Sequence, residues 1–209
     1  MRAPLAIVLA VLLFLAGCST TSPPVKEEPK AETAPEVFQV NLNTSKGLVV
    51  LEIHRDWAPV GADHFYTLVK TRFFDDARFF RVVRNFVVQF GINGNPKTNQ
   101  VWSMTNLRDD PVKEHNRKGS LTYATAGPNT RTTQMFINLK DNLNLDRDGF
   151  APIGKVINGM DIVESLYDSY GDMPPRGQGP DPSKIETEGN EYLQNRFPRL
   201  DYIKKATIQ

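Results

Sequence analysis

The chain has 209 residues, of which 40% are hydrophobic and 23% are charged, and this length suits one domain of ordinary size with a tail. The 25 basic and 24 acidic residues leave a formal net charge of +1 without a long block of either sign. Because the sequence lacks the electrostatic footprint of a nucleic-acid-binding protein, we expect no nucleic-acid partner.

The first residues are typical of a secretory signal. Arg2 is followed by the apolar run LAIVLAVLLFLAG. This run is shorter than the roughly 20 residues that a helix needs to span a bilayer. We therefore predict a signal peptide over residues 1–17.

A lipid anchor is predicted at Cys18. The segment Leu15-Ala16-Gly17-Cys18 resembles the lipobox of bacterial lipoproteins, in which the cysteine is lipidated and becomes the new N-terminus. Cys18 is the only cysteine, and its modification would remove a free thiol from an exported protein. The alternative is a plain signal peptide that contains a cysteine. Ser19, where an aspartate would favour the inner membrane, indicates a place in the bacterial cell envelope, on the outer membrane facing the periplasm.

The residues after Cys18 are polar. STTSPPVKEEPKAETAPE, residues 19–36, is rich in Pro, Ser, Thr, Lys and Glu and has almost nothing to bury. Such a composition is typical of a disordered linker. We predict a tether over residues 18–36 and one folded domain over residues 37–209.

Short apolar segments bounded by turn residues predict about eight strands. They lie at residues 38–42, 48–54, 77–83, 85–92, 120–126, 134–139, 151–157 and 202–209. The first two flank the turn Ser45-Lys46-Gly47, which predicts a hairpin.

Helices are fewer than strands. Pro59 suits the first turn of a helix, and a following apolar stripe predicts a helix over residues 59–70. Residues 159–166 and 185–195 predict two more. The fold class is therefore mainly β, as an antiparallel barrel or sandwich with two or three helices.

Two polar segments interrupt these elements. Residues 91–119 are rich in turn formers and long for a structureless connection, which more often marks a functional loop than an accident. Residues 170–182 are rich in Gly and Pro. The region 91–119 and the region 170–199 are candidate partner surfaces, and neither contains a motif that names a partner.

Several familiar signals fail on inspection. Gly149 to Lys155 has the glycine spacing of a phosphate-binding P-loop, but Val156 stands where the Mg-binding Ser or Thr is required. The segment that starts at Asn144 imitates a calcium-binding EF-hand loop, but Lys155 replaces its bidentate Glu. The histidines lack metal-ligand spacing and are interpreted as surface or packing residues: His54, His64 and His115.

The segment FFRVV carries Arg81 among apolar neighbours, and strand alternation alone leaves open an outward, solvated arginine. However, FFDDARFFRVVRNFVVQFG resembles the cyclophilin signature, in which Phe-His-Arg-hydrophobic-hydrophobic-x-x-Phe-hydrophobic-hydrophobic-Gln-x-Gly is the core. The matching residues are Phe79, Arg81, Phe86, Gln89 and Gly91.

Further motifs of the same family follow in order. TAGPNTRTTQMFINL resembles the second signature, Ala-x-Ala-Gly-Pro-Asn-Thr followed by Gln-x-Phe-Ile. The pattern continues with Leu145, Phe150, Gly154-Lys155-Val156 and Gly159-Met160-Asp161. The resemblance covers about residues 38–166 and is to cyclophilin-type peptidyl-prolyl cis/trans isomerases.

This resemblance implies a closed antiparallel eight-stranded barrel capped by two helices. It also implies rotation of X–Pro bonds in extended, proline-containing polypeptides, without a cofactor or metal. Amide resonance sets a barrier of about 18 to 20 kcal/mol to rotation of a peptide bond. A hydrogen-bond donor that weakens this resonance lowers the barrier without an acid, base or nucleophile, which suits a polar loop without an acid, cysteine or histidine, such as residues 124–133.

The resemblance also implies roles for individual residues. Arg81 would stabilise the charge that develops at the twisted prolyl nitrogen, and Gln89 would position Arg81. The apolar pocket for the proline ring would consist of Phe86, Val87, Phe136 and Leu145, with Phe150 at its rim. Peptide contacts before the proline would come from Ala124, Thr125 and Gln134.

Six residues depart from the usual family pattern. They are Phe80 for His, Val87 for Met, Phe90 for Gly, Met135 for Phe, Asn144 for an aromatic residue and Phe150 for His or Tyr. These changes leave the arginine in place but alter the pocket rim. We expect a prolyl isomerase that assists the folding of exported proteins, and the alternative is a non-catalytic prolyl-peptide binding or scaffold module.

Overall fold

The computed structural model describes residues 32–209. The predicted signal peptide (residues 1–17), the anchor at Cys18 and most of the tether lie outside the described residues. Within residues 32–209, no helix is long and apolar enough to cross a bilayer. Before residue 37, Ala34 already contacts the domain, since it is buried and its N–H donates to Asp63 Oδ1 over 2.9 Å.

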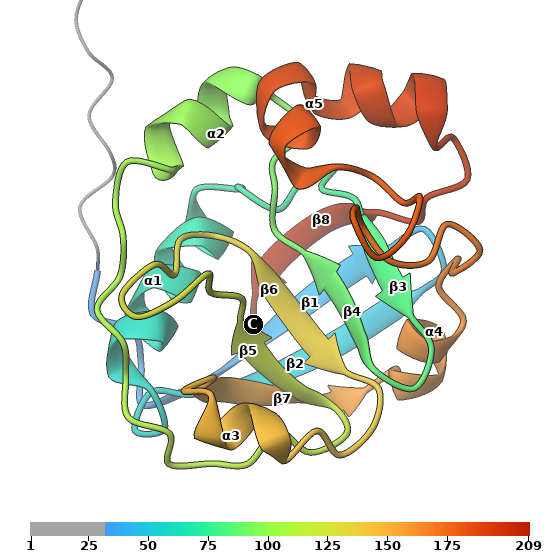
Figure 1. Ribbon diagram of the computed structural model, residues 1–209. Helices are drawn as coiled ribbons and strands as arrows, with labels where there is room; N and C mark the ends of the chain where they lie inside the picture. Colours follow the sequence, from blue (N-terminus) through green and yellow to red (C-terminus); the bar gives the residue numbers. More distant parts are fainter. Residues whose placement is uncertain (1–31) are drawn as a thin grey trace, which may run out of the picture.

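The described chain contains one antiparallel sheet of eight strands in the order β3-β4-β6-β5-β7-β2-β1-β8 (Figure 1). The strands are β1 (Val37–Thr44), β2 (Leu48–His54), β3 (Arg81–Val83), β4 (Val87–Phe90), β5 (Ser120–Tyr123), β6 (Met135–Asn138), β7 (Pro152–Asn158) and β8 (Ile203–Ile208). All eight strand predictions are confirmed, most of them with shorter bounds. The hairpin of β1 and β2 is confirmed as well.

The sheet curls into a half-barrel that stays open between its edge strands β3 and β8, so the predicted closed barrel was wrong. The isolated bridge between Arg78 and Tyr202 joins the chain beside these edges, together with a hydrogen bond from the Asp76 N–H to the Ile203 carbonyl over 2.7 Å. Directly before β3, residues 79 and 80 are not paired in the sheet, because Phe80 packs into a separate cluster with residues of the helix α5 (Pro182–Arg196). The three residues of β3 are then left to pair with β4 alone.

Five helices surround the sheet in the described part of the chain. They are α1 (Pro59–Lys70), α2 (Pro96–Trp102), α3 (Asn144–Arg147), α4 (Met160–Glu164) and α5 (Pro182–Arg196). The bounds predicted for α1 are confirmed. The polar segment 91–119 is not structureless, since it contains α2, which is capped by the Asn95 side chain and anchored by the buried Trp102. Figure 1 shows α2 beside α5 at one end of the half-barrel.

Three apolar clusters divide the interior. The main core lies between the sheet and α1 and includes Leu51, Ile53 and Phe65. A second cluster fixes α5 to the sheet and consists of Phe80, Ile92, Ile185, Leu193 and Leu200. The third cluster is built on Val87, Phe136 and Leu145, and it is separate from the main core.

Candidate active site

Strand register aligns the central site residues in one row. Arg81 of β3 pairs with Gln89 of β4, and Gln89 pairs with Phe136 of β6. The next row, Val82, Val88 and Ile137, belongs to the main core. Because successive side chains of a strand point to opposite faces, the first row lies on the face away from the main core.

Arg81 is buried on this face, with 8% of its surface exposed, so the alternative of a solvated arginine was wrong although the side chain points away from the main core. Its Nη1–H donates to Gln89 Oε1 over 3.0 Å. Its guanidinium carbon lies 5.4 Å from the centre of the Phe86 ring, within the range of a cation–π contact. A buried guanidinium is costly unless it is paired, so its partners determine which way it faces.

A hydrogen-bonded chain continues from Gln89 across the sheet. Gln89 Nε2–H donates to Gln134 Oε1 over 3.0 Å, and Gln134 Nε2–H donates to Glu186 Oε1 over 3.3 Å. The pKa of Glu186 is raised by burial, although the hydrogen bond from Gln134 lowers it. These hydrogen bonds fix the orientations of the Gln89 and Gln134 amides, because each amide donates through nitrogen and accepts through oxygen.

Asp172 completes the surroundings of Arg81 from a segment far along the chain. The Nε–H of Arg81 donates to Asp172 Oδ1 over 2.6 Å, and the Nη2–H donates to Oδ2 over 3.4 Å. Burial raises the pKa of the Asp172 carboxyl, but the hydrogen bonds and charge of Arg81 outweigh it and keep the pKa below its usual range. Asp172 is therefore a carboxylate at neutral pH.

The apolar part of the site is the third cluster. Val87, Phe136 and Leu145 are buried, and the partly exposed side chains Phe86, Ala124 and Phe150 pack against them. Phe136 meets Phe150 edge-to-face with a centroid distance of 5.8 Å. Six of the eight predicted substrate-binding residues thus lie together, and the other two are Thr125 and Gln134.

Buried asparagine side chains hydrogen-bond to the backbone of Phe86 and Phe150, the two aromatic residues at the partly exposed rim of this cluster. Asn116 Nδ2–H donates to the Phe150 carbonyl over 2.8 Å, and Asn142 Nδ2–H donates to the Phe86 carbonyl over 3.0 Å. Asn138 connects them, since it donates to Asn116 Oδ1 over 3.2 Å and accepts from Asn142 over 2.7 Å. All three amides are at most 1% exposed, so the network fixes both aromatic residues of the rim.

The loop of residues 124–133 borders the cluster and is stabilised from within. Thr125 Oγ1 bonds to the Gly127 carbonyl and lies 2.8 Å from Thr130 Oγ1, so its hydroxyl holds the turn. At the far end of the loop, Thr133 Oγ1–H donates to the Gly91 carbonyl over 2.8 Å. Gly91 has a φ of +100°, and a Cβ there would collide with the Thr133 carbonyl oxygen, so glycine allows this close approach.

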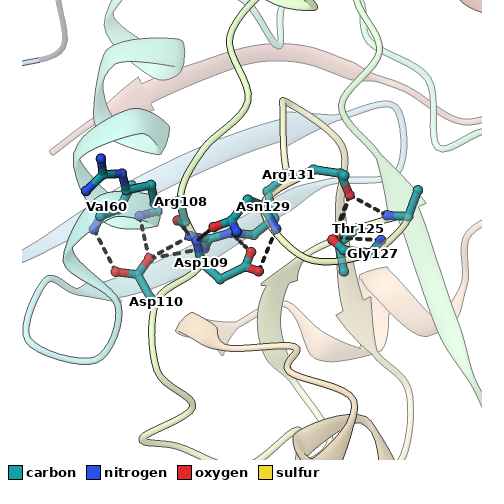
Figure 2. A network of polar contacts seen from close by, with 11 residues as sticks. Val60, Arg108, Asp109, Asp110, Thr125, Gly127, Asn129 and Arg131 are labelled. Atoms are coloured by element: carbon teal, nitrogen blue, oxygen red, sulfur yellow. Dashed lines mark hydrogen bonds and ion pairs between the residues drawn. The ribbon is translucent and has the colours of Figure 1, made fainter.

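A second polar network anchors the same loop to α1 (Figure 2). Arg131 donates from Nη1 and Nη2 to Asp110 Oδ2, both over 3.1 Å. The Asp110 carboxylate also accepts from the N–H groups of Val60 and Gly61, at 3.0 and 2.9 Å. One carboxylate therefore caps the N-terminus of α1 and balances a buried guanidinium.

Sequence reasoning missed the two carboxylates at the ends of the polar chain, Asp172 and Glu186. Asp172 lies in the Gly- and Pro-rich residues 170–182, and Glu186 lies in the predicted helix over residues 185–195, where neither acid carried a motif. Of the departures, Phe80 packs beneath α5, whereas Phe90 and Met135 belong to the main core. In the described chain no three His, Cys, Asp or Glu side chains gather as a metal site.

His64 is a packing histidine, as predicted. It is 5% exposed and lies edge-on to Trp102 with a centroid distance of 5.4 Å. Burial lowers the pKa of His64 to about 4, with a smaller contribution from the charge of Arg131. The ring is therefore neutral at physiological pH.

Comparison with solved structures supports the fold. A cyclophilin type peptidyl-prolyl cis-trans isomerase of Cryptosporidium parvum aligns with a TM-score of 0.60 at 19% identity, over 83% of this chain and 98% of that one. The same protein in the presence of the dipeptide Ala-Pro aligns with a TM-score of 0.58. The cyclophilin AquaCyp293 of Hirschia baltica aligns with a TM-score of 0.59 at 15% identity, over 84% of this chain and 75% of that one.

Sequence comparison supports the family. A peptidyl-prolyl cis-trans isomerase of Acinetobacter baylyi is 36% identical over 138 residues, which are 61% of this chain and 70% of that protein. The isomerase ppi1 of Schizosaccharomyces pombe is 32% identical over 61% of this chain and 83% of that protein. The model of the family described as cyclophilin type peptidyl-prolyl cis-trans isomerase/CLD matches residues 38–186. This chain belongs to the cyclophilin-type peptidyl-prolyl cis-trans isomerases.

Proposed function

We propose that this isomerase rotates X–Pro bonds with Arg81 as the catalytic donor and the third cluster as the pocket for the proline ring. The row of Arg81, Gln89 and Phe136 carries this proposal, because it sets a buried guanidinium beside an apolar surface on neighbouring strands. Rotation needs this combination, since the ring must be held while the amide nitrogen loses its resonance.

The guanidinium keeps donors for a substrate. Arginine has five N–H groups, and three of them bind Asp172 and Gln89. The remaining N–H groups, one on each Nη, can donate to the prolyl amide as its nitrogen becomes pyramidal. A donor fixed in advance costs no reorganisation at that moment, which is why such electrostatic stabilisation is effective.

The substrate is an extended, proline-containing polypeptide. The likeness to a structure in the presence of Ala-Pro supports this class of ligand. Phe86, Val87, Phe136, Leu145 and Phe150 would surround the proline ring. Ala124, Thr125 and Gln134 would contact the residues before it, because they lie where the loop of residues 124–133 meets the sheet.

A protease-free measurement of cis/trans exchange in a prolyl peptide tests this function. Two-dimensional NMR exchange spectroscopy on a Suc-Ala-Ala-Pro-Phe peptide measures cis/trans rotation directly, without a coupled protease. We expect exchange cross-peaks at catalytic amounts of protein. A non-catalytic binding module would instead shift the peptide signals at stoichiometric protein without accelerating exchange, and that result would contradict the proposal.

We further propose that the enzyme is anchored in the bacterial cell envelope through Cys18 and assists the folding of exported proteins. The support is the Leu15-Ala16-Gly17-Cys18 sequence after a short apolar run. Mass spectrometry of protein from the membrane fraction should find an acylated residue 18, and Cys18→Ala should abolish that modification. An unmodified wild-type Cys18 in the soluble fraction would contradict the anchor.

A further inference from the structure

The catalytic arginine has an acidic partner from outside the sheet. Asp172 lies between α4 and α5, 91 residues after Arg81, and the side chains of the two are 20% and 9% exposed. Among the described residues 32–209, Asp172 is the only carboxylate in an ion pair with Arg81. We propose that Asp172 is a positioning residue that fixes the orientation of the Arg81 guanidinium by binding its Nε and Nη2 edge. This inference rests on the proposed function of Arg81.

The geometry restricts the guanidinium from two sides. Asp172 takes the edge formed by Nε and Nη2, whereas Gln89 takes one N–H of Nη1. A planar group held at two separate edges cannot swing about its last side-chain bonds. The free N–H groups therefore keep one direction before a substrate arrives. Gln89 alone could not do this, because a single hydrogen bond leaves the plane free to rotate around it.

The segment around Asp172 is built to hold the carboxylate. The Met173 N–H donates to Asp172 Oδ1 over 2.9 Å, and the Asp172 carbonyl accepts from the Gly179 N–H over 2.9 Å. A Cβ at Gly177 would collide with the same carbonyl oxygen, which explains a glycine at this place. The Gly- and Pro-rich residues 170–182 thus form a compact turn that places the Asp172 carboxylate beside Arg81.

A second ion pair in the same segment offers a matched control. Asp168 binds Arg84, which follows β3 and is 80% exposed at its side chain. This pair also connects the segment to the end of β3, but it does not touch the Arg81 guanidinium. Asp168→Asn and Asp172→Asn therefore make the same chemical change in one segment, and only the second reaches the catalytic donor.

The experiment compares Asp172→Asn, Asp168→Asn and wild type in the exchange assay. Loss of the outer partner of a metal ligand typically costs roughly 10- to 100-fold in activity, because the ligand loses its orientation. Asp172 orients Arg81 in the same way, so we expect a loss of that order in kcat for Asp172→Asn with little change in KM. Asp168→Asn should keep wild-type kcat. Equal kcat in all three would overturn the proposal. A higher kcat in Asp172→Asn would also overturn it, since the carboxylate would then compete with the substrate.

A readout that needs no turnover separates this inference from the proposed function. The Arg81 Nε–H signal in ¹⁵N NMR should be protected from solvent exchange in wild type and Asp168→Asn. In Asp172→Asn it should exchange faster, provided that circular dichroism shows the same fold. If wild type were inactive, the proposed function would fail, yet faster Nε–H exchange would still support the positioning role. Unchanged Nε–H protection would overturn that role whatever the activity.

Discussion

Gln89 accepts from Arg81 Nη1 over 3.0 Å and donates to Gln134 Oε1 over 3.0 Å, so one amide joins the guanidinium to the residue that directly follows the loop of residues 124–133. Gln89 is 5% exposed, and water cannot easily replace either bond. The orientation of Arg81 therefore depends on a side chain that itself need not touch the prolyl nitrogen.

Gln89→Ala should lower turnover without unfolding the protein. It removes one hydrogen bond to Arg81 and one to Gln134. The bond to Arg81 alone is worth about 0.5–1.5 kcal/mol, which corresponds to a loss of roughly two- to tenfold in kcat. Gln194→Ala, an exposed glutamine on α5, is the matched control and should leave kcat unchanged. Wild-type kcat in Gln89→Ala would show that Arg81 holds its direction without the amide.

Cyclosporin should bind this protein weakly even though the chain is an isomerase. In cyclophilins that bind the drug tightly, a Trp precedes the pocket leucine and donates a hydrogen bond to the drug, whereas this chain has Asn144, exposed at the start of α3 beside the buried Leu145. The lost hydrogen bond and aromatic contact should each cost on the order of 1 kcal/mol.

Inhibition titrations of wild type and Asn144→Trp test this prediction. Asn144→Trp should strengthen inhibition roughly tenfold or more, since about 1.4 kcal/mol is a factor of ten. Turnover without the drug should stay close to wild type. Tight inhibition of the wild type, or no gain from the Trp, would show that residue 144 does not occupy the drug-contacting position.

Asp110 should matter more for stability than any neighbouring acid. Asp110→Asn leaves Arg131, which is 4% exposed at its side chain, without its buried partner and should cost about 3–5 kcal/mol in the free energy of unfolding. Asp109→Asn is the control, because Asp109 is 35% exposed and its pair with Arg131 should contribute less than about 1 kcal/mol. Urea denaturation with an unchanged m-value measures both, and equal midpoints for the two variants would contradict the prediction.

His64 should make the fold sensitive to mild acid. The pKa of His64 is about 4 in the folded chain, whereas the ordinary value of 6.5 applies in the unfolded chain. The unfolded chain therefore binds the proton first as pH falls. The stabilisation is therefore complete above pH 6.5 and is lost as pH falls towards 4. At about 1.4 kcal/mol per pH unit, the loss is on the order of 3 kcal/mol.

The comparison with His64→Phe isolates this effect, because the variant keeps an aromatic ring beside Trp102 but cannot titrate there. Thermal unfolding at a series of pH values should show a steeper decline for wild type than for His64→Phe between about pH 6.5 and 4. Parallel curves would mean that His64 is accessible to protons in the folded chain.

Local patterns predicted much of the fold. The N-terminal position of Pro59 and the apolar stripe after it were sufficient for α1, and alternation was sufficient for the hairpin of β1 and β2. α2 was missed because its buried residues are only Asn99 and Trp102, too few for an apolar stripe. The open edge between β3 and β8 could not be predicted, since it depends on where Phe80 packs in the folded chain.

The candidate site, like the fold, was only partly predictable from local sequence patterns. Arg81, Gln89 and Phe136 could be found from motifs because they lie on short neighbouring strands with a fixed register. Asp172 carries no local signal, since a single acid in a Gly- and Pro-rich segment looks like any solvated turn residue. Only the folded chain brings it to Arg81 across 91 positions of sequence.

The exchange rate of a prolyl peptide with Arg81→Ala beside wild type shows whether Arg81 is the catalytic donor. Removal of one preorganised donor typically costs roughly 100- to 1,000-fold in rate, so we expect the variant to lose at least 100-fold in kcat while circular dichroism shows an unchanged fold. Arg81→Lys, which keeps the charge without the planar fork, should recover little of that loss. A folded Arg81→Ala protein with wild-type exchange would contradict the account, because no guanidinium would then be needed for rotation.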